Sequence, residues 1–380
     1  MKQDFISAAR AHWARYPLME PQDFCKLAYQ SEFGPAHMVE SPDKTLAALL
    51  TERKEAGTEP MPPEPIGNGL CRVPITQALS TLSDLPLIGR MFSLTMAVTE
   101  GTPEGLADKL AQLEALPVPG MADYLDAYRR QGCPPVSHSE AYRNAYSPHY
   151  RVVRTDYAGY LPALRVLDRF AREHYAAWLR LSHRGDLRSS AAMRQEGLRP
   201  CLIAVDGRCG SGKTGFADIV DHLIPGSRHV IHMDDFYLPW EARAEDWKEH
   251  PAGNMDLDRL REQVLAPVSE GRPLAYPPIL QAAAEKSVDL DGEPIEVDPD
   301  DVEMILVEGT YSQHPALAGY YDWKLFLTCE HEEQTRRLQA REGDYYPTFD
   351  SLWRALEERY FAACATEAGA DLTIDTTNFF

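Results

Sequence analysis

The spacing of apolar residues predicts helices in the first half of the chain. Phe5, Ala9 and Trp13 lie on one helical face, because apolar positions recur there every three to four residues. The same spacing returns in three later stretches, at 24–28, 105–116 and 160–181. We therefore expect residues 1–185 to form a mainly α-helical N-terminal domain.

The second half has short, continuous apolar runs instead. Cys201–Val205 is such a run, and it is typical of a strand buried on both faces of a sheet. Similar runs lie at 229–233, 304–307, 324–328 and 372–374, and helical stretches separate most of them, at 215–223, 257–265 and 332–340. Strands that alternate with helices predict a parallel α/β sheet over residues 200–380. The polar segment 186–199 is the expected linker, and turn-rich residues 271–300 predict a hairpin inserted at the edge of the sheet.

Composition excludes several classes of protein. Of 380 residues, 44% are hydrophobic and 25% are charged, which is typical of a globular chain with a real core. No apolar run approaches the roughly eighteen residues of a membrane span, so no membrane partner is expected. The seven cysteines are an odd number without C-x-x-C spacing, and the N-terminus lacks the apolar stretch of a secretory signal. These features predict a cytoplasmic protein.

Charge is divided unevenly between the halves. Residues 1–195 contain 22 Lys and Arg against 22 Asp and Glu, whereas residues 196–380 contain 16 against 36. The whole net charge of −20 therefore belongs to the second half. An acidic half disfavours non-specific nucleic-acid binding, although a local pocket of hydrogen-bond donors can still bind a nucleotide.

A phosphate-binding loop follows the first predicted strand of the second half. Residues 207–214 match G-x-x-x-x-G-K-T, a loop whose backbone N–H groups and following helix N-terminus surround phosphate oxygens. The expected nucleotide-binding residues are Gly207, Arg208, Cys209, Gly210, Ser211, Gly212, Lys213 and Thr214. Lys213 is expected to reach the β- and γ-phosphates of ATP, and the Thr214 hydroxyl to ligate Mg²⁺.

Carboxylates end two other predicted strands. Asp234 and Asp235 follow the second strand, and Glu308 ends the strand that begins at Met304. Ligands gather at the carboxyl edge of an open α/β sheet, so one aspartate could accept the proton of an attacking hydroxyl. The alternatives are that an aspartate caps the next segment and that Glu308 is an ordinary strand-end residue.

Taken together, these motifs resemble those of the uridine kinase and phosphoribulokinase-like P-loop kinases. The resemblance runs over about residues 200–376 and rests on G-x-x-x-x-G-K-T, D-D-F-Y at 234–237, V-E-G-T-Y-S-x-H-P from Val307, and R-R-L-x-x-R from Arg336. It implies a nucleoside-monophosphate-kinase-like parallel sheet, with ATP as donor and Mg²⁺ as cofactor. It further implies roles for Asp234 as general base, Glu308 at the Mg²⁺ site, and Tyr237 near the acceptor.

Three arginines, Arg336, Arg337 and Arg341, fall where this family has its lid arginines. The resemblance places Arg337 and Arg341 among the catalytic residues and Arg336 near the substrate. An arginine fork suits this task because it clamps phosphate oxygens and neutralises developing charge. The alternative is a solvated basic face on a helix.

The acceptor is less well defined by the sequence. A nucleoside, uridine or cytidine first, is implied by the resemblance, as is a homo-oligomer. The stretch Leu274–Leu280 lacks the Tyr-Asp pair or histidine that the family's nucleoside kinases usually carry there. A sugar phosphate or a pantothenate-like compound is therefore an alternative acceptor. A further alternative is a regulatory ATP-binding switch that controls the N-terminal domain.

The first half contains unusual polar segments at Tyr29–Met38, Gly132–Arg143 and 146–151, to which the sequence attaches no chemistry. Residues 129–188 carry 11 Lys and Arg against 5 Asp and Glu, interleaved with tyrosines. This pattern raises the hypothesis of an RNA- or phosphate-binding domain, the only route by which nucleic acid would bind. We favour the alternative, a helical domain whose arginines pair with acidic residues of the second half.

Histidines and one cysteine complete the candidates. The separations of His37, His138 and His149 match no metal-ligand spacing, so structural roles are expected. Cys209 lies beside the predicted helix N-terminus, which raises the hypothesis of a lowered thiol pKa and redox-sensitive ATP binding. The alternative is an inert position.

Overall fold

The protein is described from a computed structural model that covers residues 4–35, 42–77, 83–182, 198–278 and 293–379. These residues form two compact units. Unit 1 comprises Met1–Leu161 with Asn378–Phe380, and unit 2 comprises Pro162–Thr377. The division falls inside helix α8 (Thr155–Ser182), upstream of residue 185, where the sequence-based boundary was placed. Most of the expected linker, 186–199, lies outside the described residues.

Unit 1 contains helices together with a small antiparallel sheet. The helices before α8 are α1 (Phe5–Arg15), α2 (Pro21–Phe33), α3 (Pro42–Glu55), α4 (Asp84–Val98), α5 (Pro103–Leu113), α6 (Met121–Arg130) and α7 (Glu140–Tyr146). The sheet has the strand order β1 (Glu64–Gly67), β2 (Leu70–Pro74), β3 (Tyr150–Arg154). The predicted helices are present, but the sequence analysis missed this sheet. Its strands are only four or five residues long, and β2 carries Arg72 between buried apolar residues. The sequence therefore showed no strand pattern there.

Part of the basic stretch 129–188 is paired within the described residues. Arg151 forms an ion pair with Glu52, and Arg154 forms one with Asp156. Three of the interleaved tyrosines, Tyr142, Tyr157 and Tyr160, are buried and therefore present no stacking face to solvent. The geometry gives the RNA-binding hypothesis no support.

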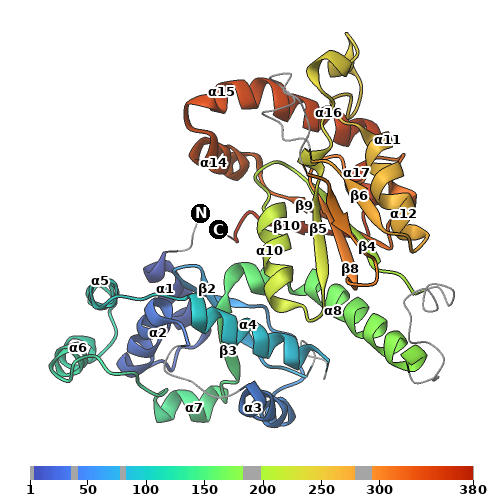
Figure 1. The fold of residues 1–380 in the computed structure, drawn as a ribbon. Coiled ribbons are helices and arrows are strands. Elements are labelled where there is room, and N and C mark those ends of the chain that lie inside the picture. Colours follow the sequence, from blue (N-terminus) through green and yellow to red (C-terminus); the bar gives the residue numbers. More distant parts are fainter. Residues whose placement is uncertain (1–3, 36–41, 78–82, 183–197, 279–292, 380) are drawn as a thin grey trace. The chain divides into compact units, whose positions relative to one another are not determined.

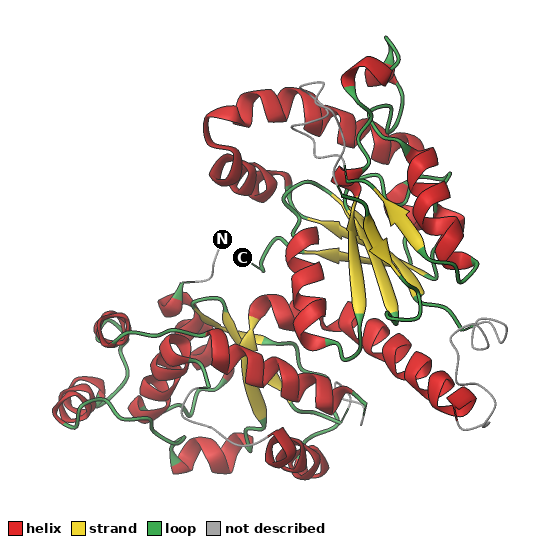
Figure 2. Ribbon diagram, viewed as in Figure 1, coloured by secondary structure: helices red, strands yellow, loops and turns green. Residues whose placement is uncertain are grey.

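Unit 2 is built on a five-stranded sheet in which every pair is parallel. The strand order is β10 (Leu372–Asp375), β9 (Trp323–Thr328), β4 (Cys201–Gly207), β8 (Met304–Glu308), β5 (Arg228–His232). All five predicted strands are confirmed. The central strand β4 is buried from Leu202 to Gly207, as its continuous apolar sequence requires. Figures 1 and 2 show this sheet among the helices that connect its strands.

Helices follow most strands of unit 2. They are α10 (Lys213–Leu223), α11 (Leu257–Leu260), α12 (Ala266–Ser269), α14 (His331–Glu342), α15 (Tyr346–Phe349), α16 (Ala355–Cys364) and α17 (Thr366–Gly369). A π-helical segment, Arg261–Leu265, joins α11 to α12. The predicted hairpin is confirmed as an antiparallel pair of β6 (Leu274–Tyr276) and β7 (Ile295–Val297). The connecting residues 279–292 lie outside the described part of the chain.

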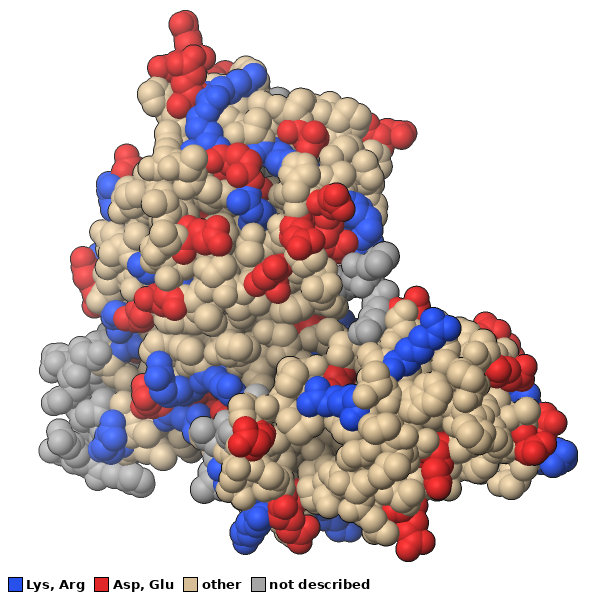
Figure 3. All heavy atoms as spheres, turned by 180° about the vertical axis from the view of Figure 1, so that it is seen from behind, with Lys and Arg blue, Asp and Glu red and all other residues tan. Residues whose placement is uncertain are grey.

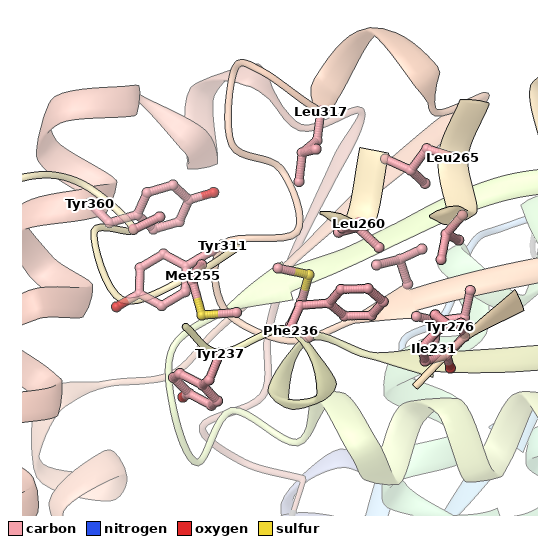
Figure 4. Packing of buried hydrophobic residues seen from close by; sticks show 14 of the residues in the cluster. Ile231, Phe236, Tyr237, Met255, Leu260, Leu265, Tyr276, Tyr311, Leu317 and Tyr360 are labelled. Atoms are coloured by element: carbon pink, nitrogen blue, oxygen red, sulfur yellow. The ribbon is translucent and has the colours of Figure 1, made fainter. Parts of the chain in front are cut away.

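Aromatic side chains dominate the core of unit 2 at one edge of the sheet. Phe236 lies 5.0 Å from Tyr276, and Tyr311 lies 4.9 Å from Tyr360, measured between ring centroids. Figure 4 shows both pairs on either side of Met255. This packing fixes the segment that follows β5, and with it the two aspartates of the candidate site.

No helix in the described ranges is long and apolar enough to cross a membrane. Acidic and basic side chains are interspersed on the face shown in Figure 3. The seven cysteines are unpaired.

Candidate active site

The phosphate loop leaves the end of β4 in a conformation that only glycine adopts without strain. Gly207 has a φ of 142°, and a Cβ there would lie 2.0 Å from the carbonyl oxygen of Leu327. Gly212 has a φ of 94°, and α10 begins at the next residue. The loop is thus followed directly by a helix N-terminus, whose partial positive charge favours an anion.

Lys213 bridges the two ends of the loop. Its Nζ donates to the carbonyl oxygens of Gly207 at 2.7 Å and Arg208 at 3.1 Å, and to Thr310 Oγ1 at 3.3 Å. These acceptors are neutral, so phosphate oxygens would compete for the ammonium group with the advantage of full charge.

Thr214 and Glu308, the predicted metal ligands, are in contact. Thr214 Oγ1 donates to Glu308 Oε1 at 3.2 Å. His232, at the end of the neighbouring strand β5, lies with Nδ1 2.6 Å from the same oxygen. The parallel register aligns His232 with Glu308. This hydrogen bond raises the pKa of His232.

Close packing fixes the turn after Glu308. Gly309 has a φ of 138°, and a Cβ there would lie 2.6 Å from Cβ of Met233. The glycine of the V-E-G segment therefore lets β8 end beside the segment that follows β5.

Asp234 combines solvent access with a crowded carboxyl group. The residue is exposed, yet burial by the atoms around its carboxyl group and the charge of Glu308 raise its pKa. Lys213 acts in the opposite direction, and the hydroxyl of the buried Tyr237 is hydrogen-bonded to the carboxylate. A base that solvent can reach and whose pKa is shifted toward neutrality suits proton abstraction.

Asp235 instead forms a contact with Arg259 through its backbone. It is buried, and its carbonyl oxygen accepts a hydrogen bond from Arg259 Nη2. Arg259 also donates from Nη1 to the carbonyl oxygen of Pro277 at 2.6 Å, and its guanidinium carbon lies 4.6 Å from the centre of the Phe236 ring. Arg259 thereby connects the end of the β6 strand to the D-D-F-Y segment.

Helices α14 and α16 hold the phosphate loop from one side. Glu357 on α16 is buried, and its Oε2 accepts from the backbone N–H of Cys209 at 2.6 Å. Gln334 on α14 donates from Nε2 to the carbonyl oxygen of Cys209 at 3.1 Å and to Glu357 Oε1 at 3.0 Å. The Cys209 peptide is therefore clamped at both its polar atoms.

Arg337 extends this clamp. Its Nη1 donates to the carbonyl oxygen of Gly210 and to Thr376 Oγ1, each at 3.0 Å, and its Nη2 donates to the Thr376 carbonyl at 2.6 Å. Its Nε donates to Glu333 Oε1 at 2.8 Å. The guanidinium thus joins the loop to the end of β10, so the geometry favours a positioning role over that of a mobile lid arginine.

The other two arginines lie at the surface. The side chain of Arg336 is 58% exposed and is paired with Glu333. That of Arg341 is 54% exposed, is paired with Glu342, and lies 5.3 Å from the centre of the Phe349 ring. Ion pairs at such exposed sites are weak, so either guanidinium could exchange its partner for a phosphate.

The hypothesis of an activated Cys209 thiol is wrong for this structure. Burial and the neighbouring carboxylate of Glu357 raise the pKa of Cys209. The helix N-terminus favours a lower thiol pKa, but burial and the negative charge that a thiolate would face have the larger effect.

A cavity of about 590 Å³ adjoins the loop on this side. Arg208 lines it and forms an ion pair with Glu358, while His331 and the buried Arg354 lie on its wall. Arg208 therefore points along α16 rather than toward the helix N-terminus of α10.

The residues present fit a magnesium ion. Thr214 and Glu308 offer oxygen ligands only, which is the donor set that Mg²⁺ prefers in phosphoryl-transfer sites. Within the described ranges, no group of three or more His, Cys, Asp or Glu residues has the arrangement of a metal centre. A site of one or two protein ligands completed by phosphates and water is consistent with that arrangement. The described His138 and His149 form no such centre, and His37 lies outside the described residues.

Sequence reasoning missed the residues that support the loop. Glu357 and Gln334 belong to helices far from the motif in sequence, and no local pattern marks them. The sequence does offer a signal for His232, because it lies two residues before the D-D-F-Y segment, at the carboxyl end of a predicted strand.

Comparisons with known proteins find uridine kinases among the sequence relatives of this chain. No family model matches the sequence. The chain is 31% identical over 165 residues to a uridine kinase from Geobacillus kaustophilus, and the match covers 41% of this chain and 74% of that protein. It is 32% identical over 165 residues to a uridine kinase from Bacillus thuringiensis, spanning 40% of this chain and 73% of the relative.

Two solved structures have weaker likeness. One, described as a possible uridine kinase from Bacillus stearothermophilus, gives a TM-score of 0.37 at 20% identity, with 49% of this chain and 97% of that chain covered. The other, a D-glycerate 3-kinase from Cryptococcus neoformans, gives a TM-score of 0.38 at 14% identity, with coverages of 57% and 92%.

Proposed function

The chain belongs to the uridine kinase family of P-loop kinases, and on this premise we propose that it transfers the γ-phosphoryl group of ATP to a hydroxyl of a small molecule. The observation that carries the proposal is the position of Asp234. This solvent-accessible carboxylate lies close enough to Glu308 and Lys213 for their charges to shift its pKa. A proton acceptor next to a phosphate loop is what transfer to an alcohol requires.

In the proposed reaction Asp234 accepts the proton of the acceptor hydroxyl. The freed oxygen forms a bond to the γ-phosphorus, the bond from that phosphorus to the bridging oxygen breaks, and ADP leaves with the electron pair. The raised pKa of Asp234 supports this role, because a carboxylate with ordinary acidity is a weaker base.

Lys213 and the loop N–H groups are proposed to hold the phosphates. For this, Lys213 exchanges the carbonyl oxygens of Gly207 and Arg208 for phosphate oxygens. The exposed Arg341 is proposed to neutralise charge on the transferring group, and Arg336 to act at the substrate. Arg337 is proposed to keep the loop in register through Gly210.

Thr214 and Glu308 would hold the magnesium ion. When bound, the ion supplies charge neutralisation to the β- and γ-phosphates. His232 shares Glu308 Oε1 with Thr214, and this contact orients the carboxylate.

For the acceptor we propose a nucleoside, uridine or cytidine first. The support is the activity named for the sequence relatives. Tyr237, whose hydroxyl bonds Asp234, is proposed to lie against the acceptor and to orient the base carboxylate. The protein is proposed to act in the cytoplasm.

The test measures ADP release from ATP and Mg²⁺ with uridine, cytidine, ribulose 5-phosphate and pantothenate as acceptors. Asp234→Asn should reduce acceptor-dependent release at least about a hundredfold, the usual contribution of a general base. Asp218→Asn is the matched control, because Asp218 is exposed on α10 and should leave the rate unchanged. Equal acceptor-dependent rates in wild type and Asp234→Asn would refute the mechanism. Release that no acceptor stimulates would favour a regulatory ATP-binding switch.

A further inference from the structure

The unassigned polar segments of the first half meet inside unit 1. Gln30 on α2, His138 before α7 and Tyr150 on β3 come from the three segments that the sequence singled out. The hydroxyl of Tyr150 lies 2.7 Å from His138 Nε2 and 3.4 Å from Gln30 Oε1. Segments more than a hundred residues apart therefore share one hydrogen-bonded centre beside Arg72 of β2.

Asp23 anchors this centre, and both oxygens of its carboxylate already accept hydrogen bonds. Its carboxylate accepts from His138 Nδ1 at 2.8 Å, from the N–H and hydroxyl of Ser139 at 3.0 and 2.6 Å, and from the N–H of Glu20 at 3.0 Å. Burial lowers the pKa of His138 to about 4, so the ring is neutral at pH 7. With Nδ1–H donated to Asp23, Nε2 accepts the proton of the Tyr150 hydroxyl.

Arg72 carries a buried charge without a carboxylate partner. Its side chain is wholly buried, and Nε and Nη2 both donate to Gln30 Oε1, at 3.1 and 2.8 Å. The guanidinium lies 4.5 Å from the centre of the Tyr150 ring. Among the described residues it forms no ion pair, and Nη1 has no hydrogen-bond partner.

The acid opposite Arg72 in the neighbouring strand is committed elsewhere. Glu64 lies opposite Arg72 in the β1–β2 register, but it accepts from the Tyr16 hydroxyl at 2.6 Å and pairs with Arg15 Nε at 3.0 Å. Burying a cation that no acid neutralises costs several kcal/mol, and a ligand that supplied the negative charge would offset this cost.

Lys26 lies near enough to Arg72 for the two charges to interact, and its Nζ donates to the carbonyl oxygen of Val136 at 3.2 Å. Burial and the charge of Arg72 lower the pKa of Lys26 to about 8. Burial and the charge of Arg72 lower the pKa of His12, whose Nε2 donates to the carbonyl oxygen of Pro65 at 3.1 Å, so its buried Nδ1 is an acceptor. Lys26 therefore adds to the positive charge around Arg72, whose Nη1 remains the donor without a partner among these groups.

We propose that unit 1 is a binding domain for a small oxyanion, a carboxylate or a phosphate group, whose oxygen accepts a hydrogen bond from Arg72 Nη1. Lys26 adds positive charge, and the Asp23–His138–Tyr150 chain fixes the ring on which the guanidinium lies. Tyr150 is only half-buried, so the centre has a side that solvent reaches. This site is separate from the phosphate loop, since all of its residues belong to unit 1.

The test is the melting temperature of the full chain carrying Lys213→Ala, which weakens phosphate binding at the loop. Sodium phosphate and sodium acetate are titrated in separate arms against sodium chloride of equal ionic strength. We expect at least one oxyanion to raise the melting temperature in proportion to the logarithm of its concentration. The arm that responds identifies the source of the oxyanion.

Arg72→Met in the same background should abolish this rise, whereas Arg130→Met, at an exposed position of unit 1, should leave it intact. If Arg72→Met shows no cooperative melting, Tyr150→Phe takes its place, and the rise should then be reduced. An equal rise in the Arg72 or Tyr150 variant would overturn the proposal. So would the absence of any rise with both oxyanions in the Lys213→Ala parent.

Discussion

Asp206, the last residue before the phosphate loop, has no access to solvent. Its carboxyl group accepts from the N–H of Gly207 at 2.7 Å, from the N–H of Gln313 at 2.9 Å and from the Tyr360 hydroxyl at 2.7 Å. Burial nevertheless raises its pKa to about 6, against the lowering effect of these bonds and of Lys213. The group that supports the loop therefore changes charge at mildly acidic pH.

This shift predicts a pH-dependent stability. The folded chain retains the proton up to about pH 6, whereas the unfolded chain releases it near pH 4, so the contribution of Asp206 to the free energy of unfolding falls as pH rises between these values. The fall is up to about 3 kcal/mol. Urea unfolding of wild type and Asp206→Asn should show the wild type losing stability relative to the variant over this window. A difference between the two that is independent of pH would contradict the raised pKa.

At the scale of elements, α14 connects the phosphate loop to the end of the sheet through Arg337. The expected lid arginines share this helix, but their environments differ. Arg337 bonds Gly210 and Thr376, whereas the neighbouring Arg336 bonds only Glu333 among the described contacts. Two adjacent residues of one helix therefore differ in role, since one forms a clamp and the other a surface ion pair.

This difference can be measured with a matched pair of variants. Arg337→Lys should reduce the free energy of unfolding by about 2 kcal/mol and weaken ATP binding, because lysine keeps the charge but cannot bond three groups in fixed directions. Arg336→Lys should change the free energy of unfolding by less than about 0.5 kcal/mol. Unaltered unfolding and ATP binding in Arg337→Lys, with only kcat reduced, would instead indicate a lid arginine.

The network between α2, α7 and β3 predicts an acid-sensitive unit 1. Burial lowers the pKa of His138 to about 4 and that of His12 to about 3, so the folded chain stays neutral at these positions while the unfolded chain binds protons below about pH 6.5. Stability is thus lost as pH falls from about 6.5 toward 4, by up to about 3 kcal/mol for His138. Thermal melting should show a shallower acid loss in His138→Gln than in wild type. The exposed His250→Gln is the control, and an unchanged slope in His138→Gln would contradict a neutral buried ring.

What the sequence revealed of the fold depended on the length and continuity of each pattern. The runs at β4, β8 and β9 are buried on both faces, so their apolar residues are contiguous and visible. The β2 strand contains a buried arginine, so it lacks a continuous apolar run, and unit 1 was predicted to be mainly helical. Tertiary burial of a charged side chain cannot be inferred from strand periodicity.

At the scale of the whole molecule, the candidate site was predictable from the sequence only where a continuous pattern of residues forms it. Residues 207–214 act through a contiguous backbone motif, which the sequence displays in full. The contact between Thr214 and Glu308 could also be expected, because both follow neighbouring parallel strands. The clamp from Glu357 and Gln334 could not be, because it depends on how α14 and α16 pack on the loop.

The chain thus joins a kinase unit to a second unit with its own polar centre. The net charge of −20 arises in residues 196–380, yet the loop of unit 2 ends in Lys213 and the helix N-terminus of α10. A local field of donors therefore makes an acidic domain suitable for an anionic substrate.

The most direct test of the central claim follows the γ-phosphoryl group itself. ATP labelled at the γ-phosphate is incubated with Mg²⁺ and uridine or cytidine, and the products are separated for wild type and Asp234→Asn. We predict that label appears in a nucleoside monophosphate with the wild type and falls at least about a hundredfold with the variant. Label found only in inorganic phosphate, at equal rates in both proteins, would contradict transfer to a nucleoside through Asp234.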